Sequence, residues 1–275
     1  AQPPTNAPPA EAAADDATTG DDQAPGRATF NATPDPDVVT LPETIVTATP
    51  FPSQPLTDDV VLSAGLAATP KSQTGSSVTV ITSEDIQRRG ARTLTEVLRT
   101  VPGLDVTPRG GPGQQTTIFT RGTEGKHTKV LLDGVPLNDP SSPSKAFDPS
   151  NFVLDNIERI EVLRGPQSAV YGSESIGGVI NIVTKRGSGP GSVTTTFEGG
   201  SFGTFRQSTS LSGGTDRYWY SLSGSWFQND GFSAAAAGTE RDGYENGTLS
   251  GRLGFQITET LDLDTTWRYI DSDVD

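Results

Sequence analysis

The chain has 275 residues, of which 32% are hydrophobic, and its formal net charge is −14. This charge argues against binding to nucleic acid, because a protein surface must supply cations to neutralise a phosphate backbone. Cysteine is absent and His127 is the single histidine, which excludes disulfides, thiolate metal sites and multi-histidine zinc sites. The sequence also lacks a P-loop, so we expect a protein that is not an enzyme and holds no cofactor.

The first part of the chain is rich in proline, alanine, threonine and aspartate. Residues 1–40 hold few large apolar side chains, so burial cannot offset the entropy of ordering them, and we expect a disordered arm. Residues 41–76 form the next region, in which 50–75 has a milder version of this composition and predicts a flexible linker. The start AQPPTNAPPA, without methionine, is compatible with a mature exported protein.

A short strand-forming run interrupts this polar region. Residues 43–48 read ETIVTA, and isoleucine, valine and threonine favour extended backbone. An isolated strand leaves its amides unpaired. The segment therefore pairs either with a later part of this chain or with another protein.

Residues 77–187 alternate short strands and helices and predict a compact α+β domain. Thr82-Ser83 supplies a predicted N-cap and Gly90 a C-cap for one helix, while Thr93 and Glu96 form a capping box for a second that ends at Pro102-Gly103. Asp133-Gly134 is a hairpin signal. Strands are predicted at 78–81, 104–107, 116–122, 129–134, 157–165 and 177–185, the last apolar on both faces and therefore central.

After residue 187 the pattern changes to strict alternation of apolar and polar side chains. Each segment runs about ten residues, as expected for transmembrane β-strands with aromatic residues near their ends. The alternative is a soluble antiparallel sheet with one solvated face. The predicted strands are 192–199, 203–212, 217–228, 248–257 and 260–269.

This order of segments resembles the N-terminal part of TonB-dependent outer-membrane receptors, over residues 43–275. The stretch IERIEVLRGPQSAVYGSESIGGVINIVTKR (157–186) is similar to the end of their plug domain. SSVTVITSEDIQ, LTEVLRTVPGLDV, GGPGQQTTIFTRGT and KVLLDGVPLN match the same family in the same order. Within the family the plug looks most like that of cobalamin receptors, and catecholate siderophore receptors share many of these phrases.

The resemblance implies an α+β plug domain followed by antiparallel transmembrane β-barrel strands, with the barrel incomplete in this chain. Residues 188–275 would supply about five strands of a 22-stranded wall, so we expect an N-terminal piece of a longer receptor. The implied location is the outer membrane of a Gram-negative bacterium, in contact with its lipid, with the N-terminal arm in the periplasm. A soluble periplasmic plug-like interaction domain remains the alternative of another class.

The resemblance also assigns partners and sites. The segment 43–48 looks like the TonB box, with Glu43, Thr44, Ile45, Val46, Thr47 and Ala48 adding a strand to an edge of TonB and its inner-membrane energising complex. The implied ligand is a cobalamin-like corrinoid, with a ferric siderophore as the alternative. The matching ligand positions are Gln115, Thr117, Glu124 and Ser142.

Two further assignments come from the same resemblance. Arg121 and Arg164 match positions that form ion pairs between plug and barrel wall, with carboxylates on later strands. In some cobalamin receptors the loop after the third strand binds calcium, which would concern Asp230 and Asp242. Because their spacing fits no calcium loop, solvated charge is the better interpretation.

Overall fold

The computed structural model describes residues 59–63, 68–231 and 242–274. The arm at 1–40 and the predicted TonB box at 43–48 lie outside these residues. All described residues belong to one compact unit, Thr47–Asp275. They form four sheets: two of five strands and two of two strands.

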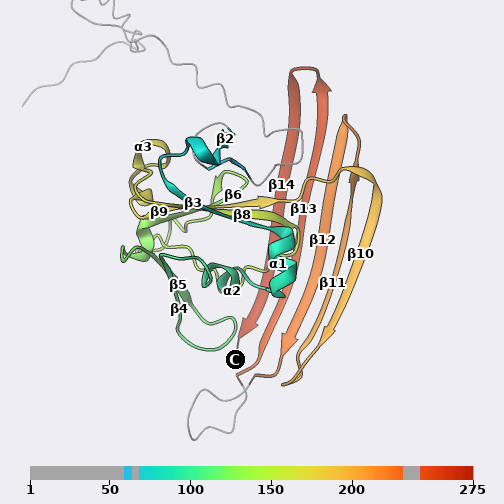
Figure 1. Cartoon of the computed structure of the whole chain (residues 1–275). Coiled ribbons are helices and arrows are strands. Elements are labelled where there is room, and N and C mark those ends of the chain that lie inside the picture. The colour runs from blue at the N-terminus through green and yellow to red at the C-terminus, as the bar shows by residue number, and fades with distance from the viewer. Residues whose placement is uncertain (1–58, 64–67, 232–241, 275) are drawn as a thin grey trace, which may run out of the picture. The chain divides into compact units, whose positions relative to one another are not determined.

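The plug region is built around one five-stranded sheet (Figure 1). Its strand order is β3-β8-β9-β6-β7, with β6 and β9 parallel and the other neighbours antiparallel. The prediction that 177–185 is central is confirmed, since this strand has a partner on each side. The strands are β3 (Ser77–Thr82), β6 (Thr128–Leu132), β7 (Val135–Pro136), β8 (Ile157–Arg164) and β9 (Gly178–Thr184).

The predicted hairpin at Asp133-Gly134 is confirmed, and the structure adds short elements that were not predicted. The Asp133-Gly134 hairpin joins β6 to β7, and both residues have positive φ, 48° and 85°. A separate hairpin pairs β4 (Leu104–Pro108) with β5 (Thr116–Thr120). The remaining short elements are η2 (Gly125–His127), α3 (Ser168–Tyr171) and η3 (Ser173–Ser175).

Both predicted capping sites begin a helix, but the Thr93–Glu96 capping box is only half formed: Thr93 accepts from the Glu96 amide, whereas the Glu96 carboxylate accepts from the Arg92 amide. Helix α1 (Ser83–Arg89) has Thr82 as its N-cap and Gly90 in the left-handed region at its C-cap. Helix α2 (Leu94–Leu98) starts after Thr93 but ends before the predicted Pro102-Gly103 stop, because Thr100 and Val101 already donate to carbonyls three residues earlier. None of the described helices is long and apolar enough to cross a membrane.

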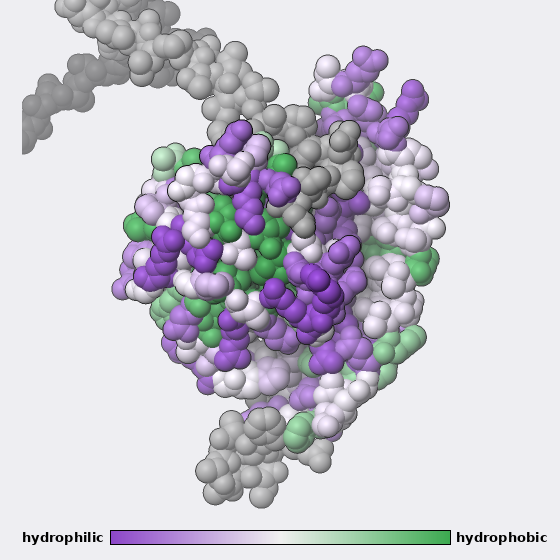
Figure 2. Space-filling view, in the orientation of Figure 1, coloured by the Kyte–Doolittle hydropathy of each residue, from purple (hydrophilic) through white to green (hydrophobic). Residues whose placement is uncertain are grey.

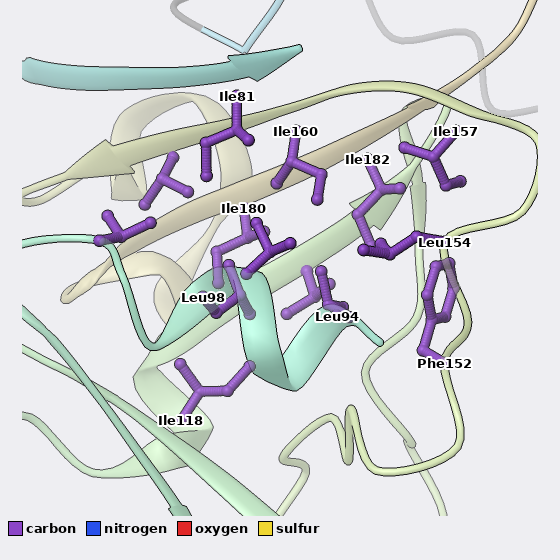
Figure 3. Packing of buried hydrophobic residues seen from close by; sticks show 14 of the residues in the cluster. Ile81, Leu94, Leu98, Ile118, Phe152, Leu154, Ile157, Ile160, Ile180 and Ile182 are labelled. Carbon is purple, nitrogen blue, oxygen red and sulfur yellow. The ribbon is translucent and has the colours of Figure 1, made fainter. Parts of the chain in front are cut away.

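One face of the plug sheet carries the apolar core. Figure 3 shows Ile160, Ile180 and Ile182 of the sheet directed toward Leu94 and Leu98 of α2. All five of these side chains are fully buried. The opposite face holds a much smaller apolar cluster of Leu131, Leu163 and Val179. One face of the sheet is therefore covered by a large apolar core, and the other face carries only a small apolar cluster.

Part of the predicted linker is ordered, so the expectation of flexibility over 50–75 is wrong for its described residues. Strand β1 (Val60–Val61) pairs with β2 (Thr69–Pro70), and η1 (Lys71–Gln73) follows. Val61 and Ser63 are completely buried against the second face of the sheet. The reason is long-range: Leu62 and Ser63 donate hydrogen bonds to Glu161, a contact that composition cannot reveal.

The second five-stranded sheet is an antiparallel meander in the order β10-β11-β12-β13-β14 (Figure 1). It confirms the five predicted strands, and most extend further than the alternation suggested. Neither β10 nor β14 pairs with a further strand among the described residues, so the sheet is not closed. The strands are β10 (Gly189–Gly199), β11 (Phe205–Gly214), β12 (Tyr218–Asn229), β13 (Tyr244–Thr258) and β14 (Leu261–Val274).

In this meander the apolar side chains face outward and the polar side chains face the plug, which is the reverse of the arrangement in a soluble sheet. The outward face is apolar, and many of its large side chains are about half exposed, among them Leu249, Phe255 and Leu263. The face toward the plug buries small polar side chains, including Ser221, Ser250 and Asn246. Apolar residues appear along the outer margin of the sheet in Figure 2. This is the arrangement expected of a barrel wall that meets lipid outside and a polar filling inside.

Candidate functional site

The plug loops enclose a hollow of about 560 Å³ that brings together all four predicted ligand positions. Gln115, Thr117, Glu124 and Ser142 all line it. They come from three segments that are separate in sequence: the β4–β5 hairpin, the turn after β5 and the loop over 138–151. The sequence prediction that these positions share a site is therefore geometrically sound, and their role in binding stays a prediction.

The structure adds residues that the sequence did not single out. Thr117 and Phe119 alternate with buried neighbours along β5, so their side chains turn away from the plug core and toward the hollow. Phe147 lines the same hollow and packs edge-on against buried Phe152, which anchors it to the core. Arg109 and Lys126 add two cationic side chains. An aromatic and cationic lining of this kind suits a large anionic or aromatic ligand.

Buried side chains fix the loop that forms one wall of the hollow. The side chain of Asn138 accepts from the Val130 amide at 2.9 Å and donates to the carbonyls of Thr128 and Lys145, both at 3.1 Å. Farther along the loop, one carboxylate oxygen of Asp148 accepts from the amides of Thr116 and Ser150 at 3.0 Å. The loop is thus tied to both β6 and β5, and the hollow is preformed.

The acidic side chains around the hollow have hydrogen-bond or ion-pair partners among the described residues, whereas one of its cationic side chains does not. Glu124 lies 2.5 Å from Lys126, and hydrogen bonding to that lysine holds the pKa of Glu124 below its usual value. Asp139 accepts from the hydroxyl and amide of Ser141, which lowers its pKa as well. By contrast, the exposed guanidinium of Arg109 has no hydrogen-bond or ion-pair partner among the described residues. The hollow therefore presents one positive charge, on Arg109, that no described acidic side chain pairs with.

The β4–β5 hairpin tip bridges from this hollow to the strands of the meander. Gly113 has a φ of 79°, and a Cβ there would lie 2.8 Å from Val274 and closer still to the ring of Tyr244. Only glycine fits so tightly between loop and wall with this backbone conformation. Beside it, a second cavity of about 390 Å³ separates plug and wall, with Arg99 and Arg206 in its lining.

Arg121 and Arg164 lie side by side around Gly103, on the plug. The Arg164 guanidinium donates to the Pro102 carbonyl and, at 2.8 Å, to the Thr79 hydroxyl. Neither arginine forms an ion pair with a carboxylate in the described part of the chain. Their assignment to ion pairs with the barrel wall stays a prediction about other strands.

Other ion pairs, which were not predicted, join the plug to the wall strands. Arg206 of β11 lies 2.6 Å from Asp155 of the plug and 2.5 Å from Glu198 of β10. Glu198 also lies 2.7 Å from Arg92, between the two plug helices. Buried Arg252 of β13 donates to the Thr184 carbonyl at 3.1 Å. These contacts connect residues far apart in sequence, so no local motif marks them.

The possible calcium loop receives no support. Asp230 and Asp242 flank residues 232–241, which the structure does not describe. Among the residues it does describe, no group of three or more histidine, cysteine, aspartate or glutamate side chains could hold a metal ion. We therefore do not propose a calcium site.

The described residues form an α+β domain with a hollow of ligand size, packed against amphipathic antiparallel strands. Residues 70–179 match the family described as the TonB-dependent Receptor Plug Domain. Residues 70–179 are thus similar to this plug-domain family, and the fold of the chain, a plug domain followed by antiparallel strands, matches that of TonB-dependent receptors.

Solved structures similar to this chain are siderophore receptors. The ferripyoverdine receptor of the outer membrane of Pseudomonas aeruginosa aligns with a TM-score of 0.64 at 19% identity, over 78% of this chain and 27% of its own. The siderophore receptor PirA from Acinetobacter baumannii aligns at 0.56 and 28% identity, over 72% and 32%. The ferric yersiniabactin uptake receptor FyuA from Yersinia pestis aligns at 0.61 and 22% identity, over 73% and 32%. The chain spans about a third or less of these receptors.

Proposed function

We propose that the receptor to which this chain contributes imports a ferric siderophore across the outer membrane. The observation that carries this proposal is the preformed hollow of about 560 Å³ with aromatic walls and one unsatisfied arginine. Solved structures at 27–28% identity are receptors for siderophores, which supports this ligand class. The cobalamin-like corrinoid favoured by the sequence resemblance has no comparable support, so the siderophore alternative replaces it.

The chemistry of the hollow favours a ligand with negative charge. Its acidic side chains are already engaged: Glu124 by Lys126, Asp139 by Ser141, and Asp148 by backbone amides. Arg109 is left to meet an incoming anion, such as a catecholate or carboxylate group that chelates iron. Phe119 and Phe147 would stack against flat chelating rings.

The connections between wall strands support an orientation in the membrane. Barrels of this type have short periplasmic turns and longer extracellular loops. The β11–β12 and β13–β14 connections are short, whereas the β12–β13 connection, 230–243, is long. The tip of the β4–β5 hairpin lies against Tyr244, at the same end as the long loop. On this basis the hollow belongs near the extracellular side and the N-terminal segment extends into the periplasm.

Energy for uptake has to come from the inner membrane, and the segment 43–48 supplies the proposed connection. Its extended backbone would add a strand to a sheet edge of TonB. A pull on this segment acts on the chain just ahead of β1, which packs directly on the plug. Ligand in the hollow and force at the N-terminus would therefore act on the same domain from two sides.

The test is uptake by the whole receptor in a Gram-negative host that lacks its own siderophore and cobalamin receptors. Iron-55 complexes of a catecholate, a mixed-ligand and a hydroxamate siderophore are offered separately, with labelled cobalamin in parallel. We expect TonB-dependent accumulation of iron from at least one siderophore and none of cobalamin. Uptake of cobalamin alone would restore the corrinoid interpretation, and uptake of none would refute both.

A further inference from the structure

The second face of the plug sheet is covered in an unusual way. It carries a row of buried polar side chains: Arg159 and Glu161 on β8, and Asn181 on β9. Glu161 and Asn181 are register partners on adjacent strands. The side-chain Oδ1 of Asn181 has no hydrogen-bond partner in the described structure. Polar groups buried in this way are costly to keep from water unless they are fully bonded.

What keeps Glu161 from water is the N-terminal segment. Its carboxylate accepts from the Leu62 amide at 2.9 Å, the Ser63 amide at 2.8 Å and the Ser63 hydroxyl at 2.7 Å. Arg159 lies 2.5 Å from the other carboxylate oxygen. Glu161 is completely buried, as is Ser63, almost one hundred residues earlier in the chain.

These hydrogen bonds are charge-assisted, and all of them are accepted by one side chain, that of Glu161. Hydrogen bonds to an ionised carboxylate are roughly twice as strong as neutral ones. The β1–β2 hairpin itself has only two residues in each strand, which is too short to be stable alone. The segment is therefore held on the plug chiefly through Glu161, together with burial of Val61.

The opposite face of the same sheet is held differently. There α1 and α2 pack on the large apolar core, which includes Leu94, Val97 and Ile180. Apolar packing spread over many side chains gives way only when the domain unfolds. Residues 60–63, called the strap below, are attached mainly at the carboxylate of Glu161, so loss of this one attachment releases them. Their release lets water reach the row of buried polar side chains, which are more favourably solvated than buried.

We infer that Glu161 is a positioning residue for transport: it fastens residues 60–63 over the polar face of the plug, and releasing this strap uncovers that face while the apolar core stays folded. The purpose of the release rests on the proposed function, because it assumes a pull on the segment ahead of β1. The fastening itself requires neither siderophore nor TonB, so it can be tested separately from uptake.

The test uses two cysteine reporters, each introduced alone into the whole receptor. Residues 1–275 contain no cysteine, and any cysteine elsewhere in the receptor is replaced by serine. Val61→Cys reports release of the strap, and Val97→Cys, in the apolar core, reports unfolding of the plug; both valines are completely buried. Maleimide labelling rates are measured for each reporter with Glu161→Gln, with Ser63→Ala and without either change. Thr74→Ala is the matched control, since its hydroxyl bonds within η1 and does not reach Glu161.

We expect Glu161→Gln to speed labelling at position 61 by at least about tenfold, corresponding to one lost charge-assisted hydrogen bond, with no change at position 97. Ser63→Ala should speed it by about threefold, and Thr74→Ala should leave it unchanged. Equal acceleration at both reporters would overturn the inference, since Glu161 would then only stabilise the fold. An unchanged labelling rate at position 61 in both variants would overturn it as well. If Glu161→Gln does not fold, the labelling rate at position 61 in Ser63→Ala is the deciding result.

Discussion

Arg206 of the wall strand β11 and Asp155 of the plug form an ion pair of 2.6 Å that is almost closed to solvent. The same guanidinium contacts Glu198, which in turn contacts Arg92. Two wall residues and two plug residues thus alternate in charge across the boundary between plug and wall. This arrangement fixes one side of the plug to the strands that directly follow it in sequence.

Replacing Arg206 with alanine should weaken this attachment strongly. The substitution leaves two carboxylates without their shared cation, and breaking a buried pair costs on the order of 3 kcal/mol. We expect a lower denaturation midpoint of the whole receptor in detergent and faster proteolysis of the plug. Arg217→Ala, on the exposed turn between β11 and β12, is the control and should behave like the wild type. A midpoint shared by all three proteins would show that the network contributes nothing to the attachment.

Gly113 provides a sharp test of the contact between plug loop and wall. Gly113→Ala forces an alanine into the left-handed region and into the space of Tyr244 and Val274, at a cost of about 1–3 kcal/mol. Because Arg109 and Gln115 at the ends of this loop line the hollow, ligand affinity should fall roughly tenfold. Gly111→Ala is the matched control, with open space around its Cβ and no positive φ. Equal affinities in a siderophore titration for both variants would contradict this account.

Local chemistry made much of the plug predictable. The caps at Thr82 and Gly90, the Asp133-Gly134 turn and the apolar run of β9 each act through neighbouring residues, so the sequence carries their signal directly. The wall strands were predictable for the same reason, since alternation needs only one face of lipid and one of polar filling.

The rest depended on contacts between distant residues. Glu161 meets Ser63 across 98 positions, and nothing around Ser63 distinguishes it from the polar linker that surrounds it. Arg206 and Asp155 are likewise 51 positions apart. In the hollow, resemblance pointed to Gln115 and Ser142, whereas Arg109 became apparent only once the acidic groups around it were seen to be engaged.

Arg109 should contribute directly to ligand affinity. Arg109→Gln keeps a polar side chain with a hydrogen-bond donor but removes the charge. A lost hydrogen bond to a charged group corresponds to about 1.5–3 kcal/mol, or roughly a 10- to 100-fold weaker Kd for an anionic ferric siderophore. Tryptophan fluorescence titration of the whole receptor measures this change. Lys71→Gln, an exposed cation outside the hollow, serves as the control. Unaltered binding by the Arg109 variant would remove the argument for an anionic ligand.

The Lys129–Glu174 pair predicts a small pH dependence of plug stability. Lys129 lies 2.6 Å from Glu174, and its hydrogen bond holds the pKa of Glu174 below 4.5. A lowered pKa in the folded state adds stability above pH 4.5, and this stability disappears as the pH falls through the folded value. Glu174→Gln should therefore lower the free energy of unfolding in urea at pH 7, by under about 1 kcal/mol because the pair is partly exposed, and should leave it unchanged at about pH 3. Glu84→Gln is the control, and a difference that is constant with pH would exclude this pair as the cause.

The segment 43–48, which lies outside the described residues, carries the proposed coupling to TonB. Ile45→Pro removes a backbone donor from the pairing edge and fixes φ near −65°, so strand addition should fail. We expect siderophore uptake to stop while siderophore binding to whole cells keeps its wild-type Kd, because the hollow is formed entirely by plug residues beyond 100. Ile45→Val keeps both the amide donor and the preference for extended backbone, and it should transport normally. Normal transport by the proline variant would mean that TonB engages the receptor elsewhere.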